Sequence, residues 1–127
     1  MIMNYNNELT ITMNTNTAAT AAMMTAKEIL ANTSTQEYYK GEFAKLANCL
    51  VVTENEVNCS DEAAVYCESY ELVLPEILKA LATQGNKFCG SSRWDSTYDF
   101  ARWNFSFDGK ELSITHRRTD NPLAHRF

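Results

Sequence analysis

The chain has 127 residues, of which 45% are hydrophobic, and its formal net charge at pH 7 is −5. This length suits one domain of ordinary size, and the hydrophobic fraction excludes a wholly disordered chain. The negative charge excludes a general electrostatic attraction to nucleic acid or to anionic membranes. We expect a single domain over residues 1–127, with a loose lead-in at 1–7 and a surface tail at 119–127.

Charge is unevenly distributed along the chain. The first 86 residues carry 11 Asp or Glu against 4 Lys or Arg, whereas residues 87–127 carry 5 against 7, together with both histidines. This asymmetry indicates one acidic face and one mildly basic face. The simpler interpretation is that acidic helices expose their charged sides to solvent, which requires no partner.

Neither a secretory signal nor a membrane-spanning segment is recognisable. The first twelve residues are polar and rich in Asn, and no apolar stretch approaches the length needed to cross a bilayer. We therefore expect a cytoplasmic protein. The frequent Asn and Thr are typical of an AT-rich genome, such as that of a bacteriophage or mobile element.

The four cysteines, Cys49, Cys59, Cys67 and Cys89, form no recognisable metal motif. Their spacings of 10, 8 and 22 residues lack the C-x-x-C pairs of structural zinc sites. Without a secretory signal, reduced thiols are favoured over two disulfides. Cys49 and Cys67 also fall on apolar helical stripes, where cysteine packs as a small hydrophobic residue. We expect neither a bound metal nor a cofactor.

A short strand is predicted at residues 8–13. Apolar residues alternate with threonines from Leu9 to Met13, which is the period of a half-buried strand. We expect this strand at an edge of the sheet. Met13 is also an alternative translation start, and with that start the strand would be dispensable.

Two amphipathic helices are predicted next. The first runs from about Ala18, or from an N-cap at Thr25, to about Ala31, and the second starts at Ser34. Thr25 and Ser34 are each followed three residues later by a glutamate, which is capping-box spacing. A polar connection is expected at 53–58. The apolar stripes are Ala19, Ala22, Met23, Ala26, Ile29 and Leu30 in the first helix, and Tyr39, Phe43, Leu46 and Leu50 in the second.

A third helix is predicted from an N-cap at Ser60 to a C-terminal cap at Gly85. Pro75 removes one backbone donor, so we expect a kink or two abutting helices there. A heptad-like seam permits a coiled-coil dimer, but the segment is short, so we expect packing within the chain. The seam consists of Ala63, Cys67, Tyr70, Leu74, Ile77 and Leu81.

Residues 101–116 are predicted to form an antiparallel hairpin that turns at Asp108-Gly109. An Asp-Gly pair between alternating segments is a strong hairpin signal, because a type I′ turn needs positive φ at both positions. One face of the hairpin is then apolar and the other polar. The predicted core-side pairs are Phe105 with Leu112, Trp103 with Ile114 and Ala101 with His116; outward, Phe100 faces Arg117 and Asp99 faces Arg118. Residues 89–92 are predicted to be a loop, and 94–99 permit a strand, a bulge or a helical turn.

The polar face of the hairpin carries the candidate binding residues. They are an aromatic ring, two guanidiniums and two hydrogen-bonding side chains: Phe100, Arg102, Asn104, Thr115 and Arg117. Such groups suit the centre of a protein interface, and they also stack bases and meet phosphates. The alternative is an ordinary solvated sheet face in which Arg117 lies over Phe100.

A protein partner is favoured over nucleic acid, because each phosphate contact needs a cation and this face offers few. Weak single-stranded nucleic-acid binding is the alternative. The acidic helices permit a converse role, in which an anionic protein occupies the basic groove of a nucleic-acid-handling protein as an inhibitor or decoy. No membrane partner is expected, and the oligomeric state is left open.

Catalysis has little support in the sequence. The two histidines are His116, expected beside Trp103 on the core side of the hairpin, and His125 in the tail. A Cys–His nucleophile pair has no local signature, and the common nucleotide-binding, serine-hydrolase and metalloprotease motifs are missing. We therefore assign no catalytic residues.

Together these patterns predict an α+β fold with three or four helices on one face of a small antiparallel sheet that contains the C-terminal hairpin. The predicted function is that of a small cytoplasmic module that acts through protein contacts, as a regulator or inhibitor. Weak single-stranded nucleic-acid binding is second, and an enzyme is third.

Overall fold

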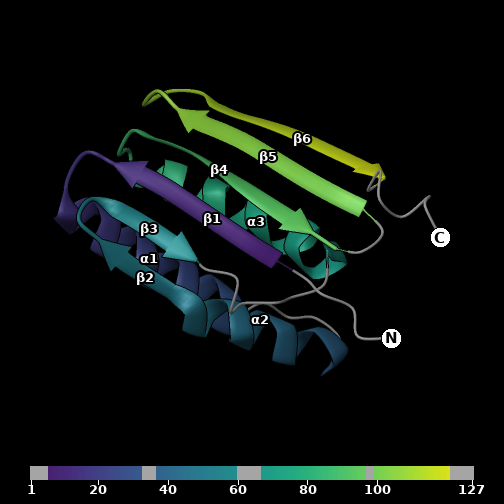
Figure 1. Cartoon of the computed structure of the whole chain (residues 1–127). Coiled ribbons are helices and arrows are strands. Elements are labelled where there is room, and N and C mark those ends of the chain that lie inside the picture. Colours follow the sequence, from purple (N-terminus) through teal and green to yellow (C-terminus); the bar gives the residue numbers. More distant parts are fainter. Residues whose placement is uncertain (1–5, 33–36, 60–66, 97–98, 121–127) are drawn as a thin grey trace.

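The structure is a computed structural model, and it describes residues 6–32, 37–59, 67–96 and 99–120. Three helices cover one face of a six-stranded antiparallel sheet whose strand order is β2-β3-β1-β4-β5-β6 (Figure 1). The predicted α+β class is confirmed. The elements are β1 Asn6–Met13, α1 Asn16–Asn32, α2 Glu37–Cys49, β2 Leu50–Thr53, β3 Glu56–Cys59, α3 Cys67–Thr83, β4 Phe88–Asp95, β5 Asp99–Phe107 and β6 Leu112–Asp120.

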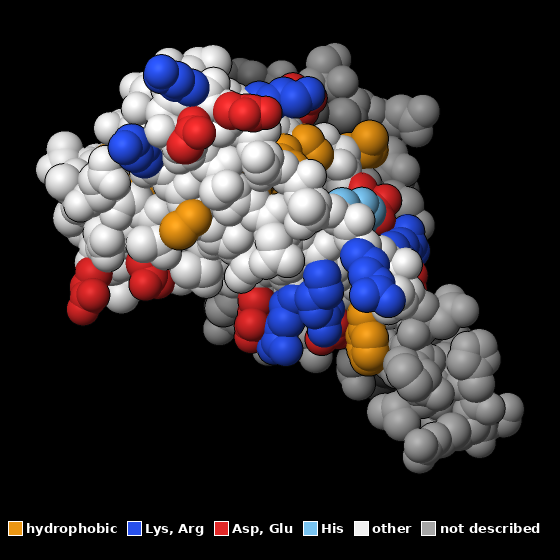
Figure 2. Space-filling model, turned by 90° about the horizontal axis from the view of Figure 1, so that it is seen from above, with side chains coloured by type: hydrophobic (Ala, Val, Ile, Leu, Met, Phe, Trp, Pro, Cys, Tyr) orange, Lys and Arg blue, Asp and Glu red, His pale blue; other side chains and the backbone are white. Residues whose placement is uncertain are grey.

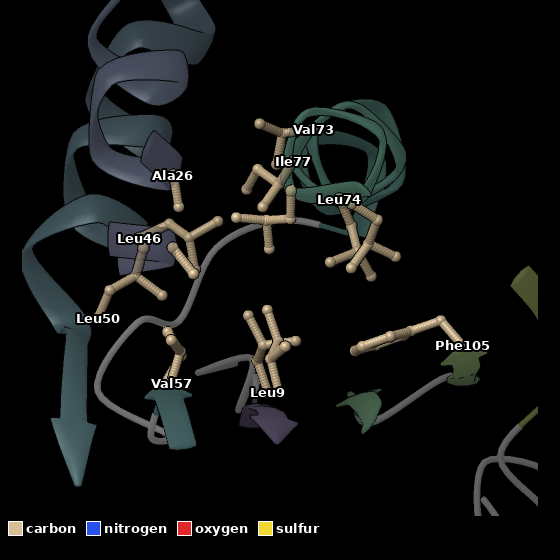
Figure 3. Packing of buried hydrophobic residues seen from close by; sticks show 14 of the residues in the cluster. Leu9, Ala26, Leu46, Leu50, Val57, Val73, Leu74, Ile77 and Phe105 are labelled. Atoms are coloured by element: carbon tan, nitrogen blue, oxygen red, sulfur yellow. The ribbon is translucent and has the colours of Figure 1, made fainter. Parts of the chain in front are cut away.

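One hydrophobic core lies between the sheet and the helices. Figure 3 shows Leu9 of β1, Val57 of β3 and Phe105 of β5 directed toward apolar side chains of the helices. The predicted α1 stripe faces this core, with its alanines and Leu30 buried and Met23 and Ile29 half-buried. The small side chains let α1 approach the sheet closely. No helix among the described residues is both long and apolar enough to cross a lipid bilayer.

The first strand lies inside the sheet, so the predicted edge position was wrong. β1 pairs with β3 over Leu9 to Thr12 on one side and with β4 over Asn6 to Met13 on the other. It therefore begins within the segment that we expected to be a loose lead-in. Both partners come later in the chain, and pairing with distant segments leaves no mark on the local sequence. A chain that started at Met13 would lack the strand that joins the two halves of the sheet.

Helix α1 begins earlier than its strongest local signal. Thr15 Oγ1 accepts a hydrogen bond from the Ala18 N–H at 3.0 Å, which is the N-cap contact. Thr25 was the alternative cap, but it lies inside the helix and donates to the Ala21 carbonyl. The structure therefore confirms the earlier of the two predicted starts. The capping-box spacing at Thr25 was misleading because the alanine-rich run upstream is itself helical.

A second hairpin occupies the region predicted to be a polar connection. Helix α2 buries Phe43 and Leu46 as predicted, and Leu50 then opens β2, which pairs with β3. Glu54 adopts φ 55° in the turn between them. The predicted α2 cap at Ser34 and the side chain of Tyr39 lie outside the part that the structure describes. The strands were missed because each has only four residues, too few to display a period.

Helix α3 runs through Pro75 as one continuous helix, so two abutting helices are not formed. Its seam packs within the chain, because Tyr70, Leu74, Ile77 and Leu81 are all buried in the core. The predicted cap at Gly85 has φ 83°, and its N–H bonds to the Ala82 carbonyl at 3.0 Å. Ser60, Ala63 and the side chain of Cys67 lie outside the described residues.

The segment predicted to be a loop at 89–92 is part of β4, so this prediction was wrong. β4 buries Phe88, Ser92 and Trp94, while Cys89, Ser91, Arg93 and Asp95 alternate with them on the other side. Gly90 suggested a turn, yet it serves close packing between strands. A Cβ at this position would lie 2.0 Å from the Thr10 carbonyl oxygen of β1 and 2.8 Å from the Phe105 ring.

The C-terminal hairpin is confirmed, but its register differs from the prediction by two residues. Phe105 pairs with Ile114 and Phe107 with Leu112, which leaves residues 108–111 in the loop. Asp108 accepts hydrogen bonds from the N–H groups of Lys110 and Glu111 at 2.8 Å, and the structure gives positive φ to Gly109 but not to Asp108. A type I′ turn is therefore not formed. Because a shift of two keeps every side chain on its face, the predicted division between core and solvent survives.

The two strands of the hairpin bury their core-side residues to different depths. Trp103 and Phe105 are fully buried, whereas Leu112 and Ile114 are half-buried because β6 lies at the edge of the sheet. Beyond residues 101–116 the strands continue, from Asp99 in β5 and to Asp120 in β6. The last strand therefore extends into the segment predicted to be a surface tail.

Candidate functional site

The sheet face opposite the helices is polar over its β4–β5–β6 half, and no described helix or strand lies over it (Figure 1). We call this half the open face. Each of its side chains lies next in sequence to a core-side residue, since neighbours along a strand point to opposite sides of a sheet. The open face consists of Cys89, Ser91, Arg93, Asp95, Phe100, Arg102, Asn104, Ser106, Ser113, Thr115, Arg117 and Thr119.

Three arginines form a row across the open face. Arg93 of β4 pairs in register with Arg102 of β5, and Arg102 pairs with Arg117 of β6. Glu8 of β1 extends the row beside Arg93. Like charges directly opposite each other on a sheet destabilise it, so the row has an electrostatic cost that folding alone does not require.

Carboxylates neutralise two of the three guanidiniums. Glu8 Oε1 accepts a hydrogen bond from Arg93 Nη2 at 2.7 Å, and Asp95 Oδ1 accepts one from Arg102 Nη1 at 2.5 Å. Arg117 differs, because no described carboxylate lies within ion-pair distance of its guanidinium. The charge available to a ligand is therefore greatest at the β6 end of the row.

The aromatic ring of the open face is covered by a different arginine from the one predicted. The guanidinium carbon of Arg102 lies 5.3 Å from the centroid of the Phe100 ring, within the range of a cation–π contact. The predicted contact between Arg117 and Phe100 was wrong, because the two-residue change in register places Thr119 opposite Phe100. Arg117 is left exposed as a result.

Two shallow hollows lie along the arginine row and share Arg102 and Asn104. One has a volume of about 410 Å³ and lies toward β6, and the other has about 310 Å³ and lies toward β1. Figure 2, seen from the β6 side, shows Lys and Arg side chains gathered together with a hydrophobic group at their margin. The first hollow is lined by Arg102, Asn104, Thr115, His116 and Arg117, and the second by Glu8, Thr10, Ser91, Ser92, Arg93, Arg102, Trp103 and Asn104.

The structure brings the five predicted binding residues together on one face. Arg102, Asn104, Thr115 and Arg117 line the larger hollow, while Phe100 lies beside it under Arg102. Sequence reasoning missed the neighbours from β1 and β4, namely Glu8, Ser91, Arg93 and Asp95. The alternation of buried and polar residues from Phe88 to Asp95 would have revealed the β4 residues, but Gly90 concealed it.

His116 stacks on a core residue, as predicted. Its ring is parallel to the indole of Trp103, with centroids 4.7 Å apart, and its Nε2 lies 3.4 Å from Glu71 Oε1 of α3. Arg118 also contacts Glu71 and donates to Asp99 Oδ2 at 2.6 Å. The sequence predicted that Asp99 faces Arg118. Their side chains form an ion pair, but in the sheet Asp99 is paired with Asp120. These contacts hold α3 against β6.

The buried Cys59 offers little nucleophilic chemistry, whereas Cys89 is exposed on the open face. Burial, with a smaller contribution from Cys49, raises the pKa of the Cys59 thiol from 9.0 to about 12, so this thiol stays protonated near neutral pH. Among the described residues, Cys49, Cys59 and Cys89 form no disulfide bond. No group of three or more His, Cys, Asp or Glu side chains in the described parts of the chain could hold a metal ion.

Comparisons with known protein families, with curated proteins and with solved structures gave no match. The chemistry of the open face therefore carries the functional argument. Guanidiniums bind carboxylates and phosphates through paired hydrogen bonds, and Asn and Thr side chains add donors and acceptors that fix orientation. What this face can do is bind an extended or flat anionic surface.

Proposed function

We propose that the protein is a small binding module that recognises an acidic segment of a protein partner on its open face. The observation that carries this proposal is the row of Arg93, Arg102 and Arg117 on a sheet face that no described helix or strand covers; Glu8 and Asp95 offset the electrostatic cost of the row only at Arg93 and Arg102. A ligand carboxylate near Arg117 would offset that cost.

The composition of the open face favours protein over nucleic acid. Among the described residues its one aromatic ring is Phe100, and the Arg102 guanidinium already lies over that ring. Single-stranded nucleic-acid platforms combine several stacking rings with a basic groove. Two of the three arginines are also paired with carboxylates, which lowers the attraction for a polyphosphate.

A module of this kind would act by occupancy. By covering an acidic surface it would block another protein from that surface, which is the action of an inhibitor or regulator. The cytoplasm is the compartment that we propose for it, on the sequence grounds given above. The alternative, also a binding function, is that the acidic helices occupy the basic groove of a nucleic-acid-handling protein and act as a decoy.

Replacement of Arg117 by Glu tests the proposal. Its guanidinium has no described ion-pair partner, so Arg117→Glu should leave the free energy of unfolding within about 0.5 kcal/mol of the wild type. Affinity capture from the native host should then lose the partner. The matched control is Lys79→Glu, which makes the same charge change on the exposed side of α3 and should retain the partner. Equal capture by both variants would refute a role for the open face.

Single-stranded nucleic acid is the second candidate, favoured by the arginine row and its two hollows. Fluorescence anisotropy with a labelled oligodeoxythymidine at low salt measures it directly. Binding that weakens with salt and disappears in an Arg102→Glu/Arg117→Glu double variant would support this candidate. No anisotropy change for the wild type at low salt would reject it.

A further inference from the structure

The two edges of the sheet differ in length and in exposure. β2 is an edge strand of four residues, which is short enough to resist pairing with another chain. β6, at the other edge, has nine residues and pairs with β5 at nine successive positions. Its side chains from Ser113 to Thr119 are exposed, except for the half-buried Ile114.

The outer side of β6 offers a regular set of backbone groups. The ladder between β5 and β6 has no bulge, and β6 contains neither proline nor glycine. The Asp108 N–H donates to the Glu111 carbonyl, so these two residues form a hydrogen-bonded pair. In an antiparallel ladder such pairs alternate with pairs that do not bond to each other, so Ser113, Thr115 and Arg117 of β6 bond to β5 and the residues between them do not. The residues that direct their N–H and C=O groups away from β5 are therefore Leu112, Ile114, His116 and Arg118.

The charges of β6 select the strand that could pair with it. Arg117 and Arg118 form a basic stretch in β6, whose one acidic residue, Asp120, lies at its C-terminal end. Arg118 is already paired with Glu71 and Asp99, so the charge that a ligand can reach is that of Arg117. Pairing of β6 with the β6 of a second copy would bring two such basic stretches together, which disfavours self-association. A strand that carries carboxylates at alternate positions has the complementary charge.

We propose that an extended acidic segment of the partner adds to the sheet as a seventh strand along β6. This inference rests on the proposed function and names the way in which the partner binds. Backbone hydrogen bonds to Ile114, His116 and Arg118 would fix the register of the added strand. Its carboxylates, on the side of the open face, would lie beside Arg117 and the hollow lined by Arg102.

The other side of the added strand would meet the margin of the hydrophobic core. Leu112 and Ile114 pack against that core and are only half-buried, because no described strand lies beyond β6. An added strand would cover both side chains. Since successive residues of a strand point to opposite faces, the partner segment should alternate acidic and aliphatic residues.

Two synthetic peptides of equal length and charge test the inference. A Glu-Val repeat can form backbone hydrogen bonds along β6, whereas a Glu-Pro repeat has half its N–H groups removed and cannot pair as a regular strand. The readout is amide hydrogen exchange by NMR, residue by residue, at low salt. In the free protein, the amides of Ile114, His116 and Arg118 should exchange faster than those of Thr115 and Arg117, which face β5.

We expect the Glu-Val peptide to slow exchange at Ile114, His116 and Arg118 at least tenfold and to leave Thr115 and Arg117 nearly unchanged. The Glu-Pro peptide should not produce this alternation. Strand addition is overturned if both peptides shift the resonances around Arg117 without the alternating protection; the proposed function then still stands. It is also overturned if neither peptide binds, or if β6 becomes protected with rising protein concentration alone, which would indicate self-pairing. Loss of partner capture in Arg117→Glu remains the separate test of the proposed function.

Discussion

The indole ring of Trp103 and the imidazole ring of His116 lie parallel, at an interplanar angle of 6°, on directly opposite positions of β5 and β6. Trp103 also contacts Tyr70 of α3, with ring centroids 5.1 Å apart. The indole therefore joins the outermost hairpin to the helical layer. This position explains why a residue near the edge of the sheet is 1% exposed.

Trp103→Ala should lower the free energy of unfolding by about 3–5 kcal/mol, because it removes a fully buried indole and leaves a cavity between α3 and β5. His116→Ala removes the exposed partner of the stack and should cost no more than about 1 kcal/mol. Urea denaturation followed by circular dichroism measures both values. A Trp103→Ala protein as stable as the wild type would contradict the observed register.

Gly90→Ala should cost about 2–3 kcal/mol or more, because the added Cβ would overlap the Thr10 carbonyl and force β1 and β4 apart. Gly41→Ala in α2 is the matched control. Nothing lies within 4 Å of a Cβ at that position, and alanine is the better helix former, so it should stabilise the protein by about 0.5–1 kcal/mol. Thermal melting of the two variants should therefore give shifts of opposite sign.

Two buried hydroxyls join α3 to the sheet, and their removal should be strongly non-additive. Ser92 Oγ lies 2.7 Å from the Glu8 carbonyl, which can only accept, so Ser92 donates there and Tyr70 Oη–H donates to Ser92 Oγ at 2.6 Å. Ser92→Ala leaves the Tyr70 hydroxyl without this acceptor and should cost about 1–3 kcal/mol. In Tyr70→Phe/Ser92→Ala, the loss should be smaller than the sum of the single losses. Additive losses in a double-mutant cycle would contradict the contact.

Cys59 should make the protein sensitive to alkali. Burial raises the pKa of its thiol from 9.0 to about 12, so above pH 9 the unfolded chain loses this proton while the folded chain keeps it. Stability from this group is complete below pH 9 and falls by up to about 1.4 kcal/mol per pH unit as pH rises toward 12. Urea denaturation with a reductant at pH 8 and pH 10.5 measures the loss.

Cys59→Val is the control for this prediction, because it keeps the apolar contact and removes the titrating group. The burial of Tyr70 also raises the pKa of that phenol, and the Tyr70 contribution remains in both proteins. The wild type should therefore lose about 1–2 kcal/mol more than the variant between the two pH values. Parallel losses in the two proteins would contradict the assignment to Cys59.

Several parts of the fold could be predicted because their signals are local. The helical stripe from Ala19 to Leu30, the seam from Tyr70 to Leu81 and the alternation from Ala101 to Phe107 each recur with the period of their element. The candidate binding residues Arg102, Asn104 and Arg117 could be placed on one face for the same reason. A two-residue error in the turn left them there, since strand faces alternate with a period of two.

Other parts depended on contacts between segments distant in the sequence. The central place of β1 is set by pairing with Cys59 and Ser92, far along the chain, and no pattern within residues 6–13 encodes those partners. Gly90 could be read as a turn until the neighbouring backbone showed why a side chain is excluded there. For this reason Arg93 and Glu8 were absent from the predicted site.

The sequence by itself determined which residues of each helix and of the C-terminal hairpin face the core, because side-chain period is a local property of the backbone. Only the tertiary structure decided the strand order and the register of the last hairpin. The arginine row follows from those two, because it needs three strands in a particular order and register. The exposed edge of β6 follows from the strand order alone. The features of the open face on which a function can be proposed therefore came from strand pairing, which the local sequence does not encode.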